Sequence, residues 1–249
     1  MRQDTPIYIA TVLLERNRWT LDKAPSFAVS EWGQRFHDAG FDGVELWENH
    51  LLLAMDEEQA AIQDMACPVV YYNTYAGFGD EDADALREAA DWIRRLGAKG
   101  CKYNLGKDPS RRETERRNLR AWVASLPEGC MPLCECHGGT MLEDPRDAAR
   151  FFQEADLPRN GIIVHAMGGD EERLHPWFDL FGPAIRHLHI VLHREPDLAG
   201  RLAYFERAGF AGSMTVEFTQ GVAEPGENMA DLFASAVDDL DTLRAALGA

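Results

Sequence analysis

The 249-residue sequence lacks any run of about 18 apolar residues, the length that crosses a membrane, so no membrane partner is predicted. Basic residues are scarce, because 25 Lys and Arg stand against 42 Asp and Glu and leave a formal charge of −17. Such a charge repels a phosphate backbone, so nucleic acid is not expected as a partner either. The segment Met1–Pro6 has no signal-peptide pattern, and we therefore expect a cytoplasmic protein.

Cysteine is also scarce, and its number is odd. The five residues are Cys67, Cys101, Cys130, Cys134 and Cys136. An odd number in mostly apolar runs indicates reduced thiols rather than a disulfide framework. A structural zinc site from Cys130, Cys134, Cys136 and His137 is disfavoured, because alternation along a strand puts Cys136 and His137 on opposite faces.

Several motifs of large enzyme classes are absent. No Gly-x-Gly-x-x-Gly follows the first apolar run, which disfavours the doubly wound sheet that is the alternative fold. We also find no His-Glu-x-x-His, Gly-x-Ser-x-Gly or phosphate-loop pattern. Zinc peptidases, serine hydrolases and P-loop enzymes are therefore not indicated.

What the sequence contains is a regular alternation of short apolar runs and amphipathic segments. The predicted strands are Ile7–Leu13, Gly43–Trp47, Pro68–Asn73, Gly100–Asn104, Met131–Cys136, Gly161–His165, His187–Leu192 and Ser213–Phe218. The predicted helices are Ser26–Ala39, Leu51–Met65, Glu81–Leu96, Arg111–Ser125, Pro145–Ala155, Glu171–Phe181, Asp197–Ala208 and Asn228–Leu247. Eight strands, each followed by a helix, predict an α/β fold that is a single (β/α)8 TIM barrel, and we expect one domain over residues 1–249.

A glycine pattern supports this alternation. The segment 39–43, Ala-Gly-Phe-Asp-Gly, returns as Ala-Gly-Phe-Ala-Gly at 208–212 and more loosely as Leu-Gly-Ala-Lys-Gly at 96–100. The first glycine of each suits the left-handed position after a helix, and the second opens a strand. The pattern therefore predicts helix-to-strand turns.

Polar side chains mark the carboxyl ends of the predicted strands, where a barrel of this kind holds its active site. Alternation places Glu135 and His137 on one face of the fifth strand and turns Cys134 and Cys136 towards the other. The remaining candidates come from the other strand ends and loops: Glu45, Trp47 and His50, Lys102 or Tyr103, His165, His187 and His189, Arg194, and Glu217.

Four consecutive strands end in Glu135, His165, His189 and Glu217. Gathering such groups is opposed by desolvation and repulsion unless a cation holds them together, so this pattern predicts a metal site. Two carboxylates and two imidazoles favour manganese, cobalt, zinc or iron over magnesium. His187 lies about 6.8 Å before His189 along the strand, and we expect it to be buried below the metal.

The sequence resembles the xylose isomerase-like barrel superfamily, which includes sugar isomerases and epimerases, inosose dehydratases and the apurinic endonuclease family. The matching segments are 40–47, Gly-Phe-Asp-Gly-Val-Glu-Leu-Trp; 135–140, Glu-Cys-His-Gly-Gly-Thr; 186–190, Arg-His-Leu-His-Ile; and 215–218, Thr-Val-Glu-Phe. The similarity extends over essentially the whole chain.

The resemblance implies that Glu135, His189 and Glu217 bind a divalent metal. The usual fourth ligand of the superfamily is an aspartate on the sixth strand, and here that position holds His165, so either His165 is the fourth ligand or the site has lost one. We favour the imidazole as a ligand, because neutral histidine binds transition metals.

The resemblance also implies a sugar isomerase or epimerase, in which Glu135 and Glu217 move a proton next to a carbonyl and the metal stabilises the enediolate. His137, Glu45, Trp47, His50, Lys102 and Arg194 are the expected substrate-binding residues. A lyase that dehydrates a keto-inositol or cleaves a 3-keto C-glycoside would begin with the same proton abstraction. A binding protein with a degraded metal site is the non-enzymatic alternative.

The endonuclease function is disfavoured, because that family needs a basic groove and more ligands for three zinc ions. Short loops leave the pocket without an obvious lid, and Trp19 in the first loop is the candidate for one wall. We therefore expect a small carbohydrate as the ligand, and a homodimer or larger assembly in which a partner chain completes the pocket.

Overall fold

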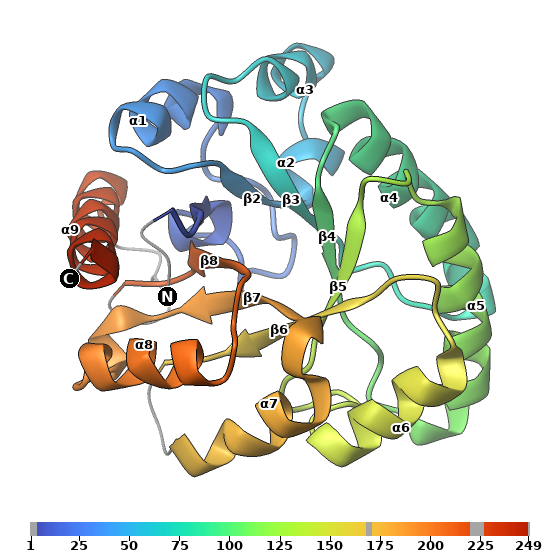
Figure 1. Cartoon of the computed structure of the whole chain (residues 1–249). Helices are drawn as coiled ribbons and strands as arrows, with labels where there is room; N and C mark the ends of the chain where they lie inside the picture. The colour runs from blue at the N-terminus through green and yellow to red at the C-terminus, as the bar shows by residue number, and fades with distance from the viewer. Residues whose placement is uncertain (1–3, 168–170, 220–226, 249) are drawn as a thin grey trace.

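The computed structural model describes residues 4–167, 171–219 and 227–248. Its eight parallel strands form a closed barrel in chain order, and the last strand pairs with the first (Figure 1). The strands are β1 (Ile7–Ala10), β2 (Val44–Trp47), β3 (Val69–Asn73), β4 (Gly100–Tyr103), β5 (Met131–Glu135), β6 (Gly161–His165), β7 (Ile185–Ile190) and β8 (Ser213–Val216). The prediction of a (β/α)8 TIM barrel is confirmed.

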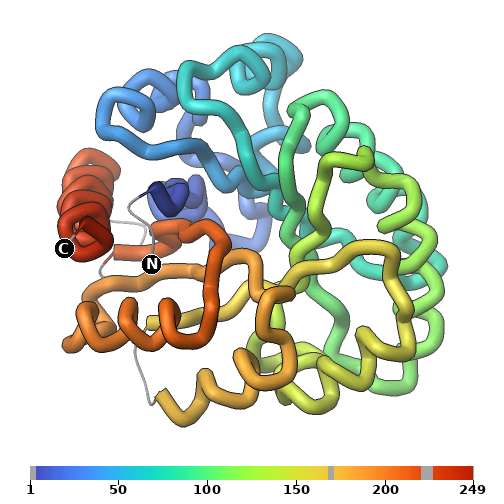
Figure 2. Tube along the Cα trace, in the orientation of Figure 1, coloured from blue at the N-terminus to red at the C-terminus, as the bar shows by residue number. Residues whose placement is uncertain are grey.

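Helices surround the barrel, and the chain follows this ring in one direction (Figure 2). They are α1 (Gly33–Asp38), α2 (Asn49–Leu52), α3 (Asp56–Gln63), α4 (Ala83–Leu96), α5 (Arg112–Ser125), α6 (Pro145–Ala155), α7 (His175–Phe181), α8 (Leu198–Arg207) and α9 (Met229–Gly248). The ring of Phe233 on α9 lies 5.5 Å from that of Trp32 and 5.7 Å from that of Phe36, so the last helix packs against the first. Among the described residues, no helix is long and apolar enough to cross a membrane.

The barrel interior is unusually polar. The outward-facing side chains of the strands pack with the helices in one large apolar core. Barrels of this type generally fill their interior with layers of branched apolar residues. Here, buried polar or charged residues stand on strands at the interior instead: Glu45, Asn73, Lys102, Glu135, His187, His189 and Thr215. Burying such groups is costly in free energy unless they are paired, so we expect them to contact one another inside the barrel.

The glycine turns are confirmed. Gly40, Gly97 and Gly209 have φ values of 91°, 61° and 75°, in the left-handed region where a side chain is strained. Each lies between a helix and the next strand, so the repeated motif serves the fold and not a ligand.

Two predicted helices near the amino terminus are wrong in extent. The segment 51–65 is not one helix, because Met55 is extended with ψ of 157° and separates α2 from α3. The segment 26–39 is helical only from Gly33, after a 3-10 turn at Ser30–Trp32. The carboxylate of Glu58 binds the backbone N–H and the hydroxyl of Ser30, a tertiary contact that holds this turn.

Strand ends and one helix start also differ from prediction. β1 ends at Ala10 and β7 at Ile190, and 3-10 turns follow at Thr11–Leu13 and Leu192–Arg194. β8 ends at Val216, so Glu217 and Phe218 lie in the following loop. A 3-10 turn at Glu171–Arg173 precedes α7, in which Pro176 takes a first-turn position that needs no backbone N–H.

Candidate active site

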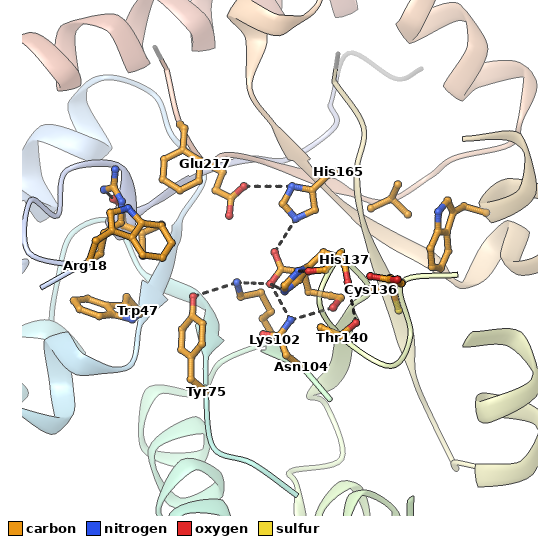
Figure 3. A pocket seen from close by; sticks show the side chains of 18 of the residues that line it. Arg18, Trp47, Tyr75, Lys102, Asn104, Cys136, His137, Thr140, His165 and Glu217 are labelled. Carbon is orange, nitrogen blue, oxygen red and sulfur yellow. Dashed lines mark hydrogen bonds and ion pairs between the residues drawn. The ribbon is translucent and has the colours of Figure 1, made fainter. Parts of the chain in front are cut away.

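A cavity of about 810 Å³ opens at the carboxyl ends of the strands (Figure 3). Lys102 on β4, Glu135 on β5, His165 on β6 and Glu217 after β8 all line it. Polar groups from strands far apart in the sequence therefore meet in one space, as the parallel barrel requires.

The four predicted metal-binding residues lie together. Oε1 of Glu135 is 2.9 Å from Nε2 of His165 and 3.1 Å from Nδ1 of His189. Oε1 of Glu217 is 3.3 Å from the same His189 nitrogen, and Oε2 of Glu217 is 3.7 Å from Nδ1 of His165. Candidate ligand atoms of Glu135, His165 and His189 all lie within 4.8 Å of one another, the spacing of a metal site.

The orientation of the His189 imidazole is fixed by a hydrogen bond to Glu45, deeper in the barrel. Its Nε2 lies 3.1 Å from Oε1 of Glu45, which is buried on β2. An ionised carboxylate only accepts hydrogen bonds, so His189 donates its Nε2–H to Glu45. Its Nδ1 then faces Glu135 and Glu217. A carboxylate behind a histidine is the usual support of a metal-binding imidazole.

The buried atoms of this cluster suit a cation. Nδ1 of His189 and Oε2 of Glu217 are buried without a hydrogen-bond partner among the residues that the structure describes. Burial alone would lower the pKa of His189, but the carboxylates of Glu217, Glu45 and Glu135 outweigh it and raise that pKa well above the usual range. Glu45, Glu135 and Glu217 bring three negative charges, and the ammonium of Lys102 and a proton on His189 leave one of them unbalanced. A divalent ion at Nδ1 of His189 would take the place of that proton and balance the carboxylates.

The second oxygen of Glu135 is held separately. Its Oε2 accepts hydrogen bonds from Nζ of Lys102 at 2.8 Å and from Nδ2 of Asn104 at 3.1 Å. Burial opposes ionisation of Glu135, but Lys102, together with His165 and His189, outweighs burial and holds the pKa of Glu135 well below its usual range. Glu135 is therefore a fixed carboxylate with one oxygen directed at the histidines.

A second buried group, formed by Glu45, His187 and His189, lies beneath the first. His187 contacts Oγ of Ser213 through Nδ1 and Oγ1 of Thr215 through Nε2, both at 2.8 Å. Oε2 of Glu45 is 3.1 Å from Nε2 of His187. Both His187 nitrogens have partners, so this group is a hydrogen-bond network that supports His189 rather than a second ion site.

The predicted substrate-binding residues divide into two sets. Trp47, Lys102 and His137 line the cavity. Lys102, not Tyr103, faces the interior, since the Tyr103 hydroxyl donates to Asn160 in the outer layer.

The other three predicted residues lie elsewhere. Glu45 is 1% exposed, and it lies below the cavity floor. His50 is buried beside the rings of Phe27 and Trp47, and burial lowers its pKa to about 3. Arg194 is exposed in the turn after β7. None of the three lines the cavity, so their expected contacts with substrate are not supported by this geometry.

The cysteines in β5 and directly beside it are only partly as expected. Cys134 and Cys136 are both buried with their sulfurs 3.7 Å apart, but Cys136 also borders the cavity. The sulfur of Cys130 lies 3.8 Å from that of Cys101. Cys130 therefore points to β4 and does not join His137 in a zinc site.

Sequence reasoning missed several residues of the site. Asn104 stands two residues after Lys102, so the alternation of side chains along a strand predicts that both face the barrel interior. This signal was present in the sequence. Asn73 ends β3 and donates to Oε1 of Glu45 at 2.7 Å, so the strand-end argument would also have found it. Tyr75 and Arg18 line the cavity from loops, and no sequence pattern marks them.

No protein-family model matches the sequence, and no curated protein matches it. Solved structures do match. The 3-keto-D-glucoside 4-epimerase YcjR from E. coli has a TM-score of 0.68 and 18% identity, over 97% of this chain and 99% of that one. A xylose isomerase-like TIM barrel protein from Mycobacterium smegmatis, in complex with magnesium, has a TM-score of 0.71 and 14% identity, over 99% of both chains. The probable 3-DHS dehydratase AsbF from Bacillus anthracis, involved in petrobactin synthesis, has a TM-score of 0.70 and 14% identity, over 95% of this chain and 98% of that one. The chain thus has the fold of the xylose isomerase-like TIM barrel proteins, as its sequence predicted.

Proposed function

We propose that the protein is a divalent-metal-dependent sugar isomerase or epimerase that removes a proton next to a carbonyl group. The observation that carries this proposal is the convergence of Nδ1 of His189 with the carboxylates of Glu135 and Glu217 at the floor of a cavity. The fold is shared with an epimerase of keto-glucosides and with a protein that contains magnesium, which supports a carbohydrate substrate and a metal.

The proposed ligands are Glu135, His165, His189 and Glu217. Two carboxylates and two imidazoles favour manganese, cobalt, zinc or iron over magnesium, because imidazole is a better donor to transition metals. A bound divalent ion would polarise the substrate carbonyl and balance the charge that develops on its oxygen.

Among the two glutamates, Glu217 is the better placed to take the proton. Within the described part of the chain its Oε2 has no hydrogen-bond partner, whereas Oε2 of Glu135 is held by Lys102 and Asn104. Glu135 thus acts mainly as a ligand, and Lys102 donates to it while also facing the substrate. One free base suits an isomerisation in which the same group removes and returns the proton.

A lyase is the second candidate, and the same asymmetry favours it. Elimination needs one base to begin and an acid near the leaving group, and Lys102 and His137 both line the cavity as proton donors. The shared fold with a probable dehydratase supports this alternative. In either reaction we expect a small carbohydrate as the substrate, and Lys102, His137 and Trp47 as its contacts.

Metal content is the first test. The purified protein should bind close to one equivalent of manganese, cobalt or zinc, measured by elemental analysis after dialysis, and His189→Ala should bind much less. A content far below one equivalent that added manganese or cobalt does not restore would contradict the proposal and favour a binding protein.

Proton exchange is the second test. The metal-loaded protein is incubated in D2O with ketoses and keto-glucosides, and deuterium next to the carbonyl is measured by NMR. Glu217→Gln should abolish the exchange while leaving the cavity shape unchanged. Glu115→Gln, which alters a buried carboxylate of α5 outside the cavity, is the matched control. Exchange that survives Glu217→Gln would rule out Glu217 as the base.

A further inference from the structure

The two sides of the cavity differ in chemistry. On the side of β4, β5 and β6 the lining includes the polar residues Lys102, Glu135 and His165, and its apolar residues are Val164, Leu174 and Trp177. On the side of β8, β1 and β2, Val12, Trp47 and Phe218 line the cavity beside Glu217, and Arg18 and Lys23 line it from the loop after β1. In Figure 3, Trp47 and Arg18 lie on one side of the cavity, and Cys136 and Thr140 on the other.

This apolar side, which we call the aromatic wall (Val12, Trp47 and Phe218), is not an extension of the main core. Val12 and Trp47 form a separate buried cluster with Ala10, and Phe218 packs against it. The guanidinium of Arg18 lies 4.9 Å from the centre of the Phe218 ring. The aromatic wall is therefore a small apolar cluster separate from the main core, in which Val12 and Trp47 are buried and Phe218 is partly exposed.

The apolar lining continues outwards beyond the wall. Trp19 in the loop after β1 lines the cavity although 69% of the residue is exposed. Tyr75 after β3 also lines it and is 49% exposed. Large aromatic side chains at the rim of a pocket leave ring surface open to a ligand.

The size of the cavity fits a ligand larger than a sugar ring. Its volume of about 810 Å³ lies in the upper part of the roughly 300–1,000 Å³ range of pockets that enclose drug-sized molecules. A sugar ring has hydroxyl groups that need donors and acceptors, and the β4–β6 side supplies these. Phe218, Trp19 and Tyr75 offer flat ring surface instead, which favours stacking against another flat apolar group.

On the basis of the proposed function, we infer that the substrate is a glycoside whose sugar carries a flat apolar group, such as an aromatic aglycone. The sugar lies over Glu135, His165 and Glu217. The aglycone packs against the aromatic wall and extends under Trp19. The alternative occupant of the wall, the C–H face of the sugar itself, would not require the outer surface of Trp19.

The inference is tested by binding of matched glycosides to the metal-loaded protein, measured by calorimetry. Phenyl and methyl β-glycosides of glucose, galactose and xylose serve as the probes. Within at least one sugar series, the phenyl glycoside should bind about tenfold more tightly than the methyl glycoside. Trp19→Ala should remove most of this difference, and Trp19→Phe should restore part of it.

The control is Leu21→Ala, because Leu21 is fully exposed in the same loop but does not line the cavity. That variant should keep the preference for phenyl glycosides. Equal binding of phenyl and methyl glycosides, or a preference that Trp19→Ala leaves intact, would overturn the inference while leaving the proposed function in place. If metal binds but no glycoside of any series does, the inference is overturned, and the exchange test decides the proposed function separately. If no metal binds, both fail.

Discussion

Replacing Glu45 by Gln tests whether the network below the cavity controls the metal site. Glu45 accepts hydrogen bonds from Nε2 of His189 at 3.1 Å, from Nε2 of His187 at 3.1 Å and from Nδ2 of Asn73 at 2.7 Å. Gln keeps one acceptor oxygen, which can still hold His189 and Asn73, and it turns its amide N–H towards His187. What is lost is the negative charge that makes the His189 imidazole a stronger donor.

Loss of a carboxylate behind a metal-binding histidine generally weakens metal affinity about 10- to 100-fold. Because the Gln oxygen can still orient His189, we expect a loss near the lower end, about tenfold or 1.4 kcal/mol. The dissociation constant for zinc or manganese is measured by competition with a chromophoric chelator. Circular dichroism of the metal-free variant verifies that the barrel is folded.

The control for this measurement is Glu48→Gln. Glu48 follows the same strand, but its carboxylate binds the Thr74 hydroxyl and the Tyr75 backbone N–H, away from the histidines. Its replacement should leave metal affinity within about twofold of that of the wild type, well inside the tenfold change expected for Glu45→Gln. An affinity of Glu45→Gln that equals the control would refute the proposed support of His189.

His165→Asp adds a third carboxylate to the proposed ligands, so the affinity for magnesium relative to zinc should rise, as measured by competition between the two ions. The fold should persist, because 44% of the His165 side chain is exposed. An unchanged ratio of the two affinities would argue against His165 as a ligand. Lys102→Met removes the cation that lies 2.8 Å from Glu135 and leaves a buried carboxylate without its ion pair. The metal-free protein should therefore lose about 3–5 kcal/mol of unfolding free energy, measured by urea denaturation, and saturating manganese should recover part of this loss. An unchanged unfolding free energy would mean that the ionised Glu135 does not depend on Lys102.

The sequence by itself determined the architecture. Apolar runs of four to six residues, helical periodicity between them and glycines at the helix-to-strand turns are local signals, and the barrel follows from their order. The candidate metal ligands could also be predicted from the sequence, because the carboxyl ends of parallel strands meet at one face of the barrel. The residues at or next to those ends are Glu135, His165, His189 and Glu217.

Side-chain contacts that periodicity does not show accompany the helix boundaries. At the break of the predicted helix over residues 51–65, Nε2 of Gln59 donates to the carbonyl oxygens of Leu51 and Ala54, and the turn at Ser30 is held by Glu58 from another helix. The periodicity of apolar residues continues through both positions, so it does not mark either boundary.

Only the tertiary structure decided which polar side chains contact one another. The sequence placed Glu45 and His50 among the substrate contacts, but the fold turns Glu45 under His189 and buries His50 beside Phe27. It also showed that Lys102 and Asn104 hold one oxygen of Glu135 while Oε2 of Glu217 stays without a hydrogen-bond partner among the described residues. Alternation along a strand gives the face to which a side chain points, but its partners come from other strands, and their distances are set by the register of the closed barrel.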